Sequence, residues 1–214
     1  MKKRELAYNL LSEIEKIYPN PKSELVNWDT AFQFLVCIIL SAQTTDIQVN
    51  KVTKNLFDKY PDAKSMAKAN IKDIKNTIGS INFFNNKAKF IIEMSKMLDK
   101  QYEGIPPKDV KELQKLPGVG YKTANVFLND LYQLNQGVAV DTHVLRVAKG
   151  YGLSSNSNPD KVAKDLEKIY KKEDWYKVNS LFVLYGRYIY KAKKPDLEKV
   201  VKIGLGKSSY PKGL

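Results

Sequence analysis

The sequence contains few of the residues that build disulfides and metal sites. It has one cysteine, Cys37, in 214 residues, which excludes an internal disulfide and any metal or iron–sulfur site made of cysteines alone. Its one histidine, His143, cannot complete a zinc site by itself. We therefore expect no metal ion and no metal cofactor.

Long apolar segments are also missing. The longest uninterrupted apolar run covers residues 34–40, far short of the roughly 20 residues that a membrane-spanning helix needs. The basic start of the chain does not lead into an apolar signal segment, because Glu5, Asn9 and Glu13 interrupt it. We expect a soluble cytoplasmic protein that does not span a membrane.

Positive charge, in contrast, is abundant. The chain has 36 Lys and Arg against 23 Asp and Glu, a formal net charge of +13, and 43% of its residues are hydrophobic. A chain of this size and composition can bury a true core. A compact body with this excess of positive charge favours polyanions, with nucleic acid as the first candidate and an acidic membrane as the second. Binding to nucleic acid would place the protein at the nucleoid.

Helical spacing of apolar residues recurs along the chain, and no segment shows sustained alternation, so the sequence predicts an all-α protein. Thr30, Asp62 and Asn70 are candidate helix N-caps. Composition alone also allows a strand over 31–41. Helices are expected over residues 6–17, 31–41, 49–60, 63–69, 71–78, 85–102, 110–115, 121–131, 142–151, 159–170 and 175–191.

The segment Leu116-Pro-Gly-Val-Gly120 separates two predicted helices by a very short connection. Gly118 and Gly120 can adopt positive φ and leave no Cβ in the way, so a phosphate could approach the backbone N–H groups at the start of the next helix. Such contacts hold DNA without reading its sequence, and their affinity depends steeply on salt. The alternative is a tight interhelical turn with Val119 in the core.

Lys122 lies in the first turn of the helix after this hairpin. A cation there faces the unfavourable end of the helix macrodipole. The position therefore has a mild cost, which makes Lys122 a candidate nucleophile as well as an ordinary solvated charge.

Asp141 precedes the predicted helix at 142–151. Its default role is an N-cap that accepts backbone N–H groups of the first turn. A short carboxylate is also the group that a lysine nucleophile needs nearby, to move protons and to stabilise developing positive charge.

Several ordered motifs of this chain resemble the endonuclease III branch of the helix-hairpin-helix DNA glycosylase superfamily. The LPGVGYKTANVFLN segment and VAVDTHVLRV are similar to the family signature, and three further segments fit the family pattern. In order, the motifs occupy residues 34–46, 78–88, 116–129, 138–147 and 184–188.

The resemblance implies an all-α, two-lobed protein with a DNA-binding cleft between its lobes. One lobe, a six-helix barrel over 22–134, would contain the hairpin, and the second would combine 1–21 with 135–214. The implied partner is double-stranded DNA containing a damaged base or an abasic site, bound by a monomer.

The resemblance also implies a bifunctional DNA glycosylase and AP lyase of base excision repair. Lys122 would be the catalytic lysine that attacks the sugar C1′ and forms a Schiff base, followed by β-elimination 3′ to the lesion. Asp141 would be the catalytic aspartate.

Further residues are assigned to DNA by the same resemblance. Gln43 would fill the space left by the extruded nucleotide, and Phe83 would wedge between base steps; their alternatives are a polar helix end and core packing against Phe84. Asn82 stands where the family usually has glycine, and Asn tolerates left-handed geometry. His143 is expected to hydrogen-bond at its helix start rather than act as a base. The remaining implied DNA contacts are Gly118, Val119, Gly120 and Thr123.

The chain departs from the family at the C-terminal cysteines that hold a [4Fe-4S] cluster. The same spacing falls here on Tyr190, Leu197, Val200 and Gly206. None can bind iron, so we expect the cluster to be absent and a small apolar knot to replace it. Five lysines would take over its contribution to phosphate binding, at positions 191, 193, 194, 199 and 202.

The lesion stays open at this point. Oxidised pyrimidines are the first candidate and mismatched uracil or thymine the second, while Lys122 argues against the adenine-removing branch, which lacks this lysine. A different class of function is a non-catalytic helix-hairpin-helix module that grips DNA for a partner. A glycosylase of the same fold without strand cleavage is the third interpretation.

Overall fold

The computed structural model describes residues 2–21 and 23–203. Within these ranges the secondary structure is helical, with no strand, which confirms the predicted all-α class. The helices group into two compact units: a hairpin unit, Ser23–Tyr132, and a terminal unit, Met1–Lys22 plus Gln133–Leu214. None of the helices in the described ranges is both long enough and apolar enough to cross a membrane.

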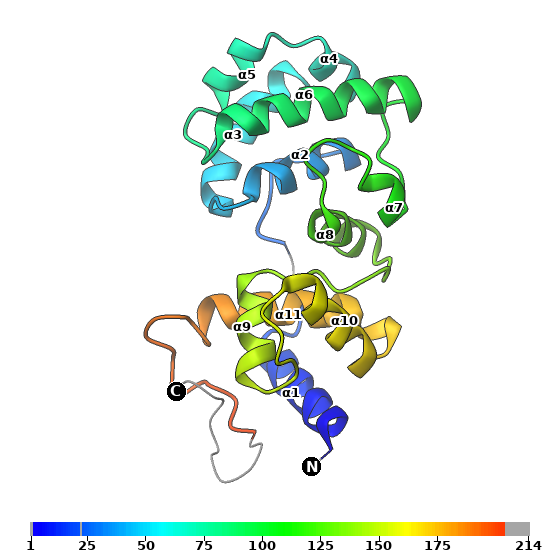
Figure 1. Ribbon diagram of the computed structural model, residues 1–214. Coiled ribbons are helices and arrows are strands. Elements are labelled where there is room, and N and C mark those ends of the chain that lie inside the picture. The colour runs from blue at the N-terminus through cyan, green and yellow to red at the C-terminus, as the bar shows by residue number, and fades with distance from the viewer. Residues whose placement is uncertain (1, 22, 204–214) are drawn as a thin grey trace. The chain divides into compact units, whose positions relative to one another are not determined.

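The hairpin unit is built around α2 (Ala31–Ser41), in which every side chain from Phe32 to Leu40 is buried. A helix that is apolar on all sides is stable only when neighbours cover it all round. Here α3 (Asp46–Lys59), α6 (Phe84–Gln101) and α8 (Tyr121–Tyr132) provide that cover. Figure 1 shows α6 as the long helix lying across α2. The strand alternative for this segment is therefore wrong.

The shorter helices of this unit begin at polar caps. Asp62 caps α4 (Ala63–Ala67), Asn70 caps α5 (Ile71–Thr77) and Thr30 caps α2, each accepting a backbone N–H with its side chain. These three predicted caps are confirmed. Helix α4 ends at Ala67 rather than at residue 69, and α7 (Val110–Leu113) ends before residue 115.

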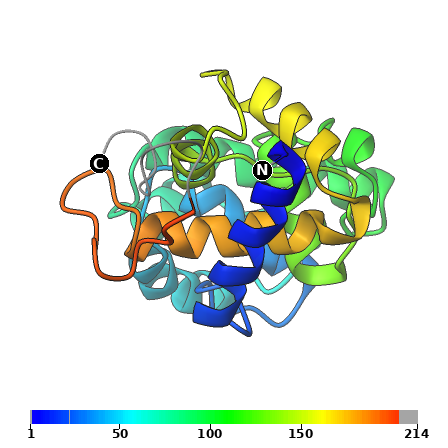
Figure 2. The ribbon, with the colours of Figure 1, turned by 90° about the horizontal axis from the view of Figure 1, so that it is seen from below.

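The terminal unit combines α1 (Lys3–Ile17) with α9 (Thr142–Gly150), α10 (Pro159–Ile169), a 3₁₀ turn at Lys172–Asp174 and α11 (Trp175–Tyr188). Figure 2 shows α1 crossing α11, on which it packs. Along α1 the side chains of Leu6, Leu10 and Ile14 are fully buried. Burying each of them contributes about 1.5–3 kcal/mol.

Helix α11 ends at Tyr188, three residues earlier than predicted. The chain turns there, because the backbone N–H of Tyr190 donates to the carbonyl of Tyr185 and that of Asp196 donates to Ile189. The segment after the turn then returns along α9 and α11, where Val200 and Val201 are buried. Sequence periodicity could not show this turn, because Tyr190 continues the apolar spacing of the helix that precedes it.

Candidate functional site

The predicted hairpin joins α7 to α8. Asp109 caps α7, and the connection from Leu116 to Gly120 contains a turn in which the N–H of Val119 donates to the carbonyl of Leu116 at 3.1 Å. Val119 is buried. The buried valine expected of a plain interhelical turn is thus present, and it anchors the hairpin to the core of its unit.

The two hairpin glycines differ from each other. Gly118 has φ +81°, and a Cβ on it would lie 2.9 Å from the Cβ of Phe90 on α6. Gly120 has no positive φ, and a Cβ there would meet no atom within 4 Å. Both glycines can adopt positive φ, and of the two Gly118 does so. Gly118 is required by conformation and by contact with α6, whereas Gly120 leaves the start of α8 open.

Helix α8 begins immediately after the hairpin, at Tyr121. The first four N–H groups of an α-helix have no partner within the helix, and they carry the positive end of the macrodipole. Lys122 is exposed in this first turn, and Thr123 is half-buried beside it. No carboxylate of the described residues pairs with the Lys122 ammonium. The amine is therefore accessible to a bound molecule.

Asp141 is the N-cap of α9, as its position predicts. A single carboxylate oxygen, Oδ1, accepts from the backbone N–H groups of His143 and Val144, each at 2.8 Å. The described part of the chain offers no hydrogen bond to the second oxygen, Oδ2. One oxygen thus fixes the carboxylate while the other keeps its acceptor capacity.

Arg146, which the sequence analysis did not single out, holds the residues around Asp141 in place. Its Nη2 lies 3.0 Å from His143 Nδ1, and its Nε donates to the carbonyl of Tyr190 at 2.7 Å. Burial lowers the pKa of the Arg146 guanidinium, and the negative charge of Asp141 acts in the opposite direction. The spacing of three residues from His143 puts both on one face of α9, which is the signal that could have indicated this pair.

Packing of α11 on α9 explains the glycine of the 184–188 motif. Gly186 of α11 packs on α9 so closely that a Cβ would lie 2.9 Å from the Cβ of His143. Its carbonyl also accepts from Arg146 Nη2. His143 is therefore a hydrogen-bonded residue at a helix start, packed against Gly186.

Gln43 and Phe83 are brought together by the hairpin unit. Gln43 lies in the turn after α2, with φ +55°, and Phe83 is the N-cap of α6, with φ +58°. The side-chain amide of Asn82 donates to the carbonyl of Gln43 at 2.6 Å, which links the two loops. Gln43 is exposed, and Phe83 is 62% exposed. Core packing of Phe83 is thus excluded.

The explanation given for Asn82 from the sequence is wrong. Asn82 does not adopt a left-handed conformation; the next residue, Phe83, does. A left-handed backbone is uncommon and strained for a bulky residue. The strain at Phe83 accompanies an aromatic side chain turned outward to solvent, and such combinations gather at functional positions.

Lys122 and Asp141 belong to different units, Lys122 to the hairpin unit and Asp141 to the terminal unit. Their joint action therefore stays a prediction.

Cys37, the one cysteine, is buried in α2, and burial raises the pKa of its thiol to about 12. A thiol of that pKa is inert, so it offers no competing nucleophile.

The residues at the cysteine positions of the family do not fit an iron–sulfur cluster. Tyr190 and Val200 are buried, whereas Leu197 is 52% exposed, so the predicted apolar knot is wrong in including Leu197; Gly206 lies outside the described residues. Gly150 of α9 leaves room for Tyr190, because any Cβ on it would collide with the tyrosine ring. In the described ranges no three His, Cys, Asp or Glu side chains gather into a metal site.

Tyr190, at the first of these positions, packs with Tyr151 and Tyr185 in a tyrosine cluster. The hydroxyls of Tyr151 and Tyr185 lie 2.6 Å apart. Tyr151 donates to the carbonyl of Val201 and Tyr185 accepts from the N–H of Val201, both at 2.9 Å. Burial is the main cause that raises the pKa of both hydroxyls, so both stay protonated and keep these bonds.

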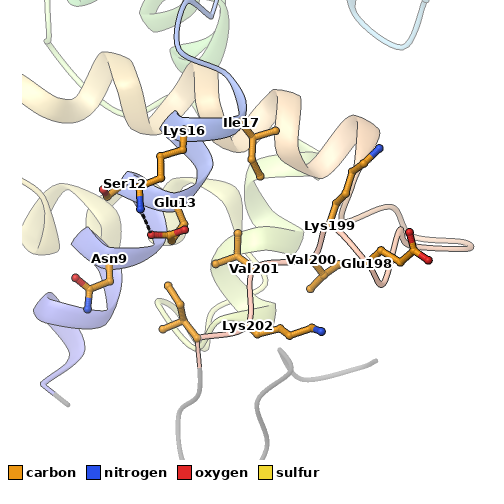
Figure 3. A pocket seen from close by; sticks show the side chains of 11 residues that line it. Asn9, Ser12, Glu13, Lys16, Ile17, Glu198, Lys199, Val200, Val201 and Lys202 are labelled. Carbon is orange, nitrogen blue, oxygen red and sulfur yellow. Dashed lines mark hydrogen bonds and ion pairs between the residues drawn. The ribbon is translucent and has the colours of Figure 1, made fainter.

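One open pocket of the terminal unit lies beside Val200 and Val201. It has a volume of about 630 Å³ and runs between α1 and the segment 198–203 (Figure 3). Glu13 and Lys16, which form an ion pair, and Lys199 and Lys202 line it with mixed charge. Lys199 and Lys202 are two of the five lysines predicted to contact phosphate, whereas neither Lys122 nor Asp141 lines the pocket.

Comparison with known proteins assigns the chain to a family. A family model described as "HhH-GPD superfamily base excision DNA repair protein" matches residues 36–172. The chain belongs to the HhH-GPD superfamily. It is 45% identical over 191 residues to Endonuclease III of Rickettsia felis, covering 89% of each chain, and 40% identical to Endonuclease III of Bacillus subtilis, covering 86% of this chain and 84% of the relative.

Solved structures of HhH-GPD proteins agree. A trapped endonuclease III–DNA covalent intermediate superposes with a TM-score of 0.87 at 39% identity, covering 92% of each chain. A thermostable thymine-DNA glycosylase has a TM-score of 0.78 at 22% identity, again over 92% of each chain, which shows the shared fold. The function predicted from the sequence, base excision repair by a DNA glycosylase and AP lyase of the endonuclease III type, is confirmed.

Proposed function

We propose that the protein removes damaged bases from double-stranded DNA through a covalent intermediate on Lys122 and then cleaves the strand. The observation that carries the proposal is the placement of Lys122: an exposed, unpaired amine in the first turn of α8, directly after a hairpin whose Gly120 leaves the helix start open. Phosphates of the DNA strand would bind the N–H groups of this helix start. The helix that binds the DNA backbone, α8, would then also carry the lysine.

The chemistry follows from an amine at the sugar. Nζ of Lys122 attacks C1′ of a nucleotide extruded from the stack, and the C1′–base bond breaks with the base leaving as its protonated form. The resulting N,O-acetal opens by cleavage of the C1′–O4′ bond, in which O4′ takes up a proton, and leaves a Schiff base between Lys122 and C1′. Loss of a proton from C2′ then expels the 3′ phosphate by β-elimination, and water releases the lysine.

Asp141 would supply the negative charge that this sequence needs. Its Oδ1 is committed to the cap of α9, while Oδ2 retains acceptor capacity. A carboxylate of this kind stabilises the positive charge that develops on the sugar and accepts a proton from the attacking amine. Arg146 and His143 would act as positioning residues for it.

Gln43 and Phe83 would enter the DNA together. Glutamine offers two donors and one acceptor, and it can therefore pair with the base that has lost its partner. The exposed ring of Phe83 would push between base steps of the opposite strand. The link from Asn82 to the Gln43 carbonyl supports a joint action of the two loops.

For the substrate we propose oxidised pyrimidines, with a single protein molecule acting on each lesion. Uracil or thymine mismatched with guanine is the competing class. Incision of a panel of duplexes, each with one lesion, distinguishes the two classes. Faster incision of mismatched uracil or thymine than of oxidised pyrimidines would contradict this choice and leave the mechanism intact.

Borohydride trapping on DNA with an abasic site tests the mechanism. Reduction of the Schiff base leaves a covalent protein–DNA adduct, which Lys122→Ala should abolish. Lys115→Ala is the matched control, because Lys115 precedes the same hairpin and its exposed ammonium pairs with Glu112. Asp141→Asn keeps an oxygen for the α9 cap but removes the charge, and should slow adduct formation by roughly 10²-fold or more.

Each other outcome contradicts the proposal in a different way. Tight DNA binding without an adduct in the unaltered protein would indicate a non-catalytic DNA-binding module. Base release without an adduct would indicate a glycosylase that does not cleave the strand. An adduct that persists in Lys122→Ala would place the nucleophile elsewhere.

A further inference from the structure

A lysine is buried beneath the two loops that carry Gln43 and Phe83. Lys87 lies in the first turns of α6 and is only 5% exposed. Its Nζ donates to the carbonyls of Leu40 and Ala42, at 2.8 and 2.6 Å, and to the hydroxyl of Thr44, at 3.1 Å. An ammonium has three N–H donors, so these three oxygens use its full capacity.

The three acceptors belong to the end of α2 and the turn that follows it. The last carbonyls of a helix have no partner within the helix, and they carry the negative end of the macrodipole. The Lys87 ammonium therefore caps α2 from a different helix. Both neighbours of Gln43, Ala42 and Thr44, are bound by the same ammonium.

Gln43 itself is held from the other side. Its left-handed backbone, with φ +55°, is strained for a residue other than glycine, and such a conformation persists only when its surroundings fix it. Asn82 donates to the Gln43 carbonyl at 2.6 Å. Lys87 and Asn82 thus bind three consecutive residues, 42 to 44, and leave the Gln43 side chain exposed.

Lys87 also binds the end of the second loop. Its backbone N–H donates to the carbonyl of Phe83 at 3.1 Å, in the first turn of α6. One residue therefore binds the Gln43 turn with its side chain and the Phe83 cap with its backbone. The two loops are coupled through the first turns of α6.

A buried cation is a costly way to stabilise a helix end. Its pKa is lowered to about 8, and the cause is desolvation by burial. No carboxylate of the described residues pairs with it, so only neutral oxygens offset the loss of hydration. An apolar side chain would fill the same space at lower cost, but it could not fix the backbone of the turn.

We infer that Lys87 is a positioning residue, which holds the 40–44 turn in the shape that lets Gln43 enter the DNA opposite a damaged nucleotide. This inference rests on the proposed role of Gln43. The gain comes from preorganisation, because a turn that is already ordered loses less entropy when it binds.

A double-mutant cycle tests this role. Lys87→Met removes the three donors, and Gln43→Ala removes the side chain that the turn presents. With a duplex containing a tetrahydrofuran abasic analogue, Lys87→Met should weaken binding about tenfold in the unaltered protein and less than about twofold in the Gln43→Ala background. Affinity for undamaged duplex should not change. Lys96→Met is the control, since it removes an exposed charge from the same helix.

A spectroscopic signal reports directly on the turn. With 2-aminopurine as the orphaned base, its fluorescence on binding depends on what stacks or pairs with it. Gln43→Ala and Lys87→Met should give the same altered signal at saturating protein, whereas Lys96→Met should match the unaltered protein. If Lys87→Met does not fold, Asn82→Ala removes the other hold on Gln43 from an exposed position and should give the same altered signal.

The inference is overturned if Lys87→Met, or Asn82→Ala in its place, weakens binding equally with and without Gln43, or leaves the 2-aminopurine signal unchanged. Failure of the proposed catalytic function would give a different experimental result. In that case the unaltered protein forms no borohydride adduct, while the binding cycle still reports whether Lys87 acts through Gln43.

Discussion

Gly118 and Gly120 lie two positions apart in the hairpin, and they are glycine for different reasons. Gly118 combines φ +81° with a contact to Phe90 that leaves no room for a Cβ. Gly120 has neither restriction. Under the proposed function, its small size would leave room for a phosphate at the start of α8.

Substitution of the two glycines by alanine should separate folding from DNA binding. Gly118→Ala should lower the free energy of unfolding by about 1–3 kcal/mol, because alanine is strained at positive φ and its Cβ would displace Phe90. Gly120→Ala should leave the free energy of unfolding within about 0.5 kcal/mol. It should nevertheless weaken binding to abasic-site duplex several-fold. Urea denaturation and binding titrations measure the two effects.

The pair of variants provides its own control. If Gly120→Ala binds DNA as well as the unaltered protein, no phosphate approaches the hairpin at that position. If Gly118→Ala is as stable as the unaltered protein, the contact with Phe90 does not restrict the turn.

At the scale of elements, the sequence predicted those features that depend on residues close together in the chain. Helix N-caps at Thr30, Asp62, Asn70 and Asp141 could be found because a cap bonds to residues two or three positions away. The hairpin between α7 and α8 is equally local. These signals fix where helices begin and which residues lie at their starts.

Contacts between distant segments could not be predicted in the same way. The bonds of Lys87 join positions about 45 residues apart, and the Asn82–Gln43 bond spans 39. The left-handed conformation of Phe83 depends on how its loop meets α6, so the sequence assigned it to the wrong neighbour. The end of α11 was misjudged because the tyrosine cluster, and not local propensity, turns the chain there.

The tyrosine cluster fixes the returning segment by two hydroxyls. Tyr185→Phe should lower the free energy of unfolding by about 1–3 kcal/mol, because the N–H of Val201 loses its acceptor in a buried place. The segment after residue 190 should also become easier to cleave in limited proteolysis. Tyr188→Phe is the control, since Tyr188 is 45% exposed on the same helix. Equal losses in the two variants would mean that the cluster does not anchor the segment.

For the whole molecule, one cysteine in the sequence means that four cysteine ligands for a [4Fe-4S] cluster cannot be provided. The described residues at three of the four family positions, Tyr190, Leu197 and Val200, supply no thiolate. We propose that the tyrosine cluster stabilises the segment that an iron–sulfur cluster would hold in other family members. Exposed lysines after α11, at positions 191, 193, 194, 199 and 202, would present charge to phosphates.

Purified protein should therefore contain no stoichiometric iron and show no absorption band near ~400 nm. A strong chelator should leave its melting temperature and its borohydride trapping unchanged. An endonuclease III that has the four cysteines, treated in parallel, serves as the comparison. Stoichiometric iron, or a melting temperature that falls with chelation, would contradict the prediction.

The tyrosine cluster also affects the conditions under which the protein can be produced in working form. Two hydroxyls, translated with the rest of the chain, bind its returning segment. Without a cluster, completion of this part of the fold would wait for no cofactor assembly machinery. On the prediction that no cluster is bound, synthesis would draw nothing from the iron pool, and oxidants that dismantle iron–sulfur clusters would find no target in this segment. A repair enzyme built in this way would keep its activity when iron is scarce.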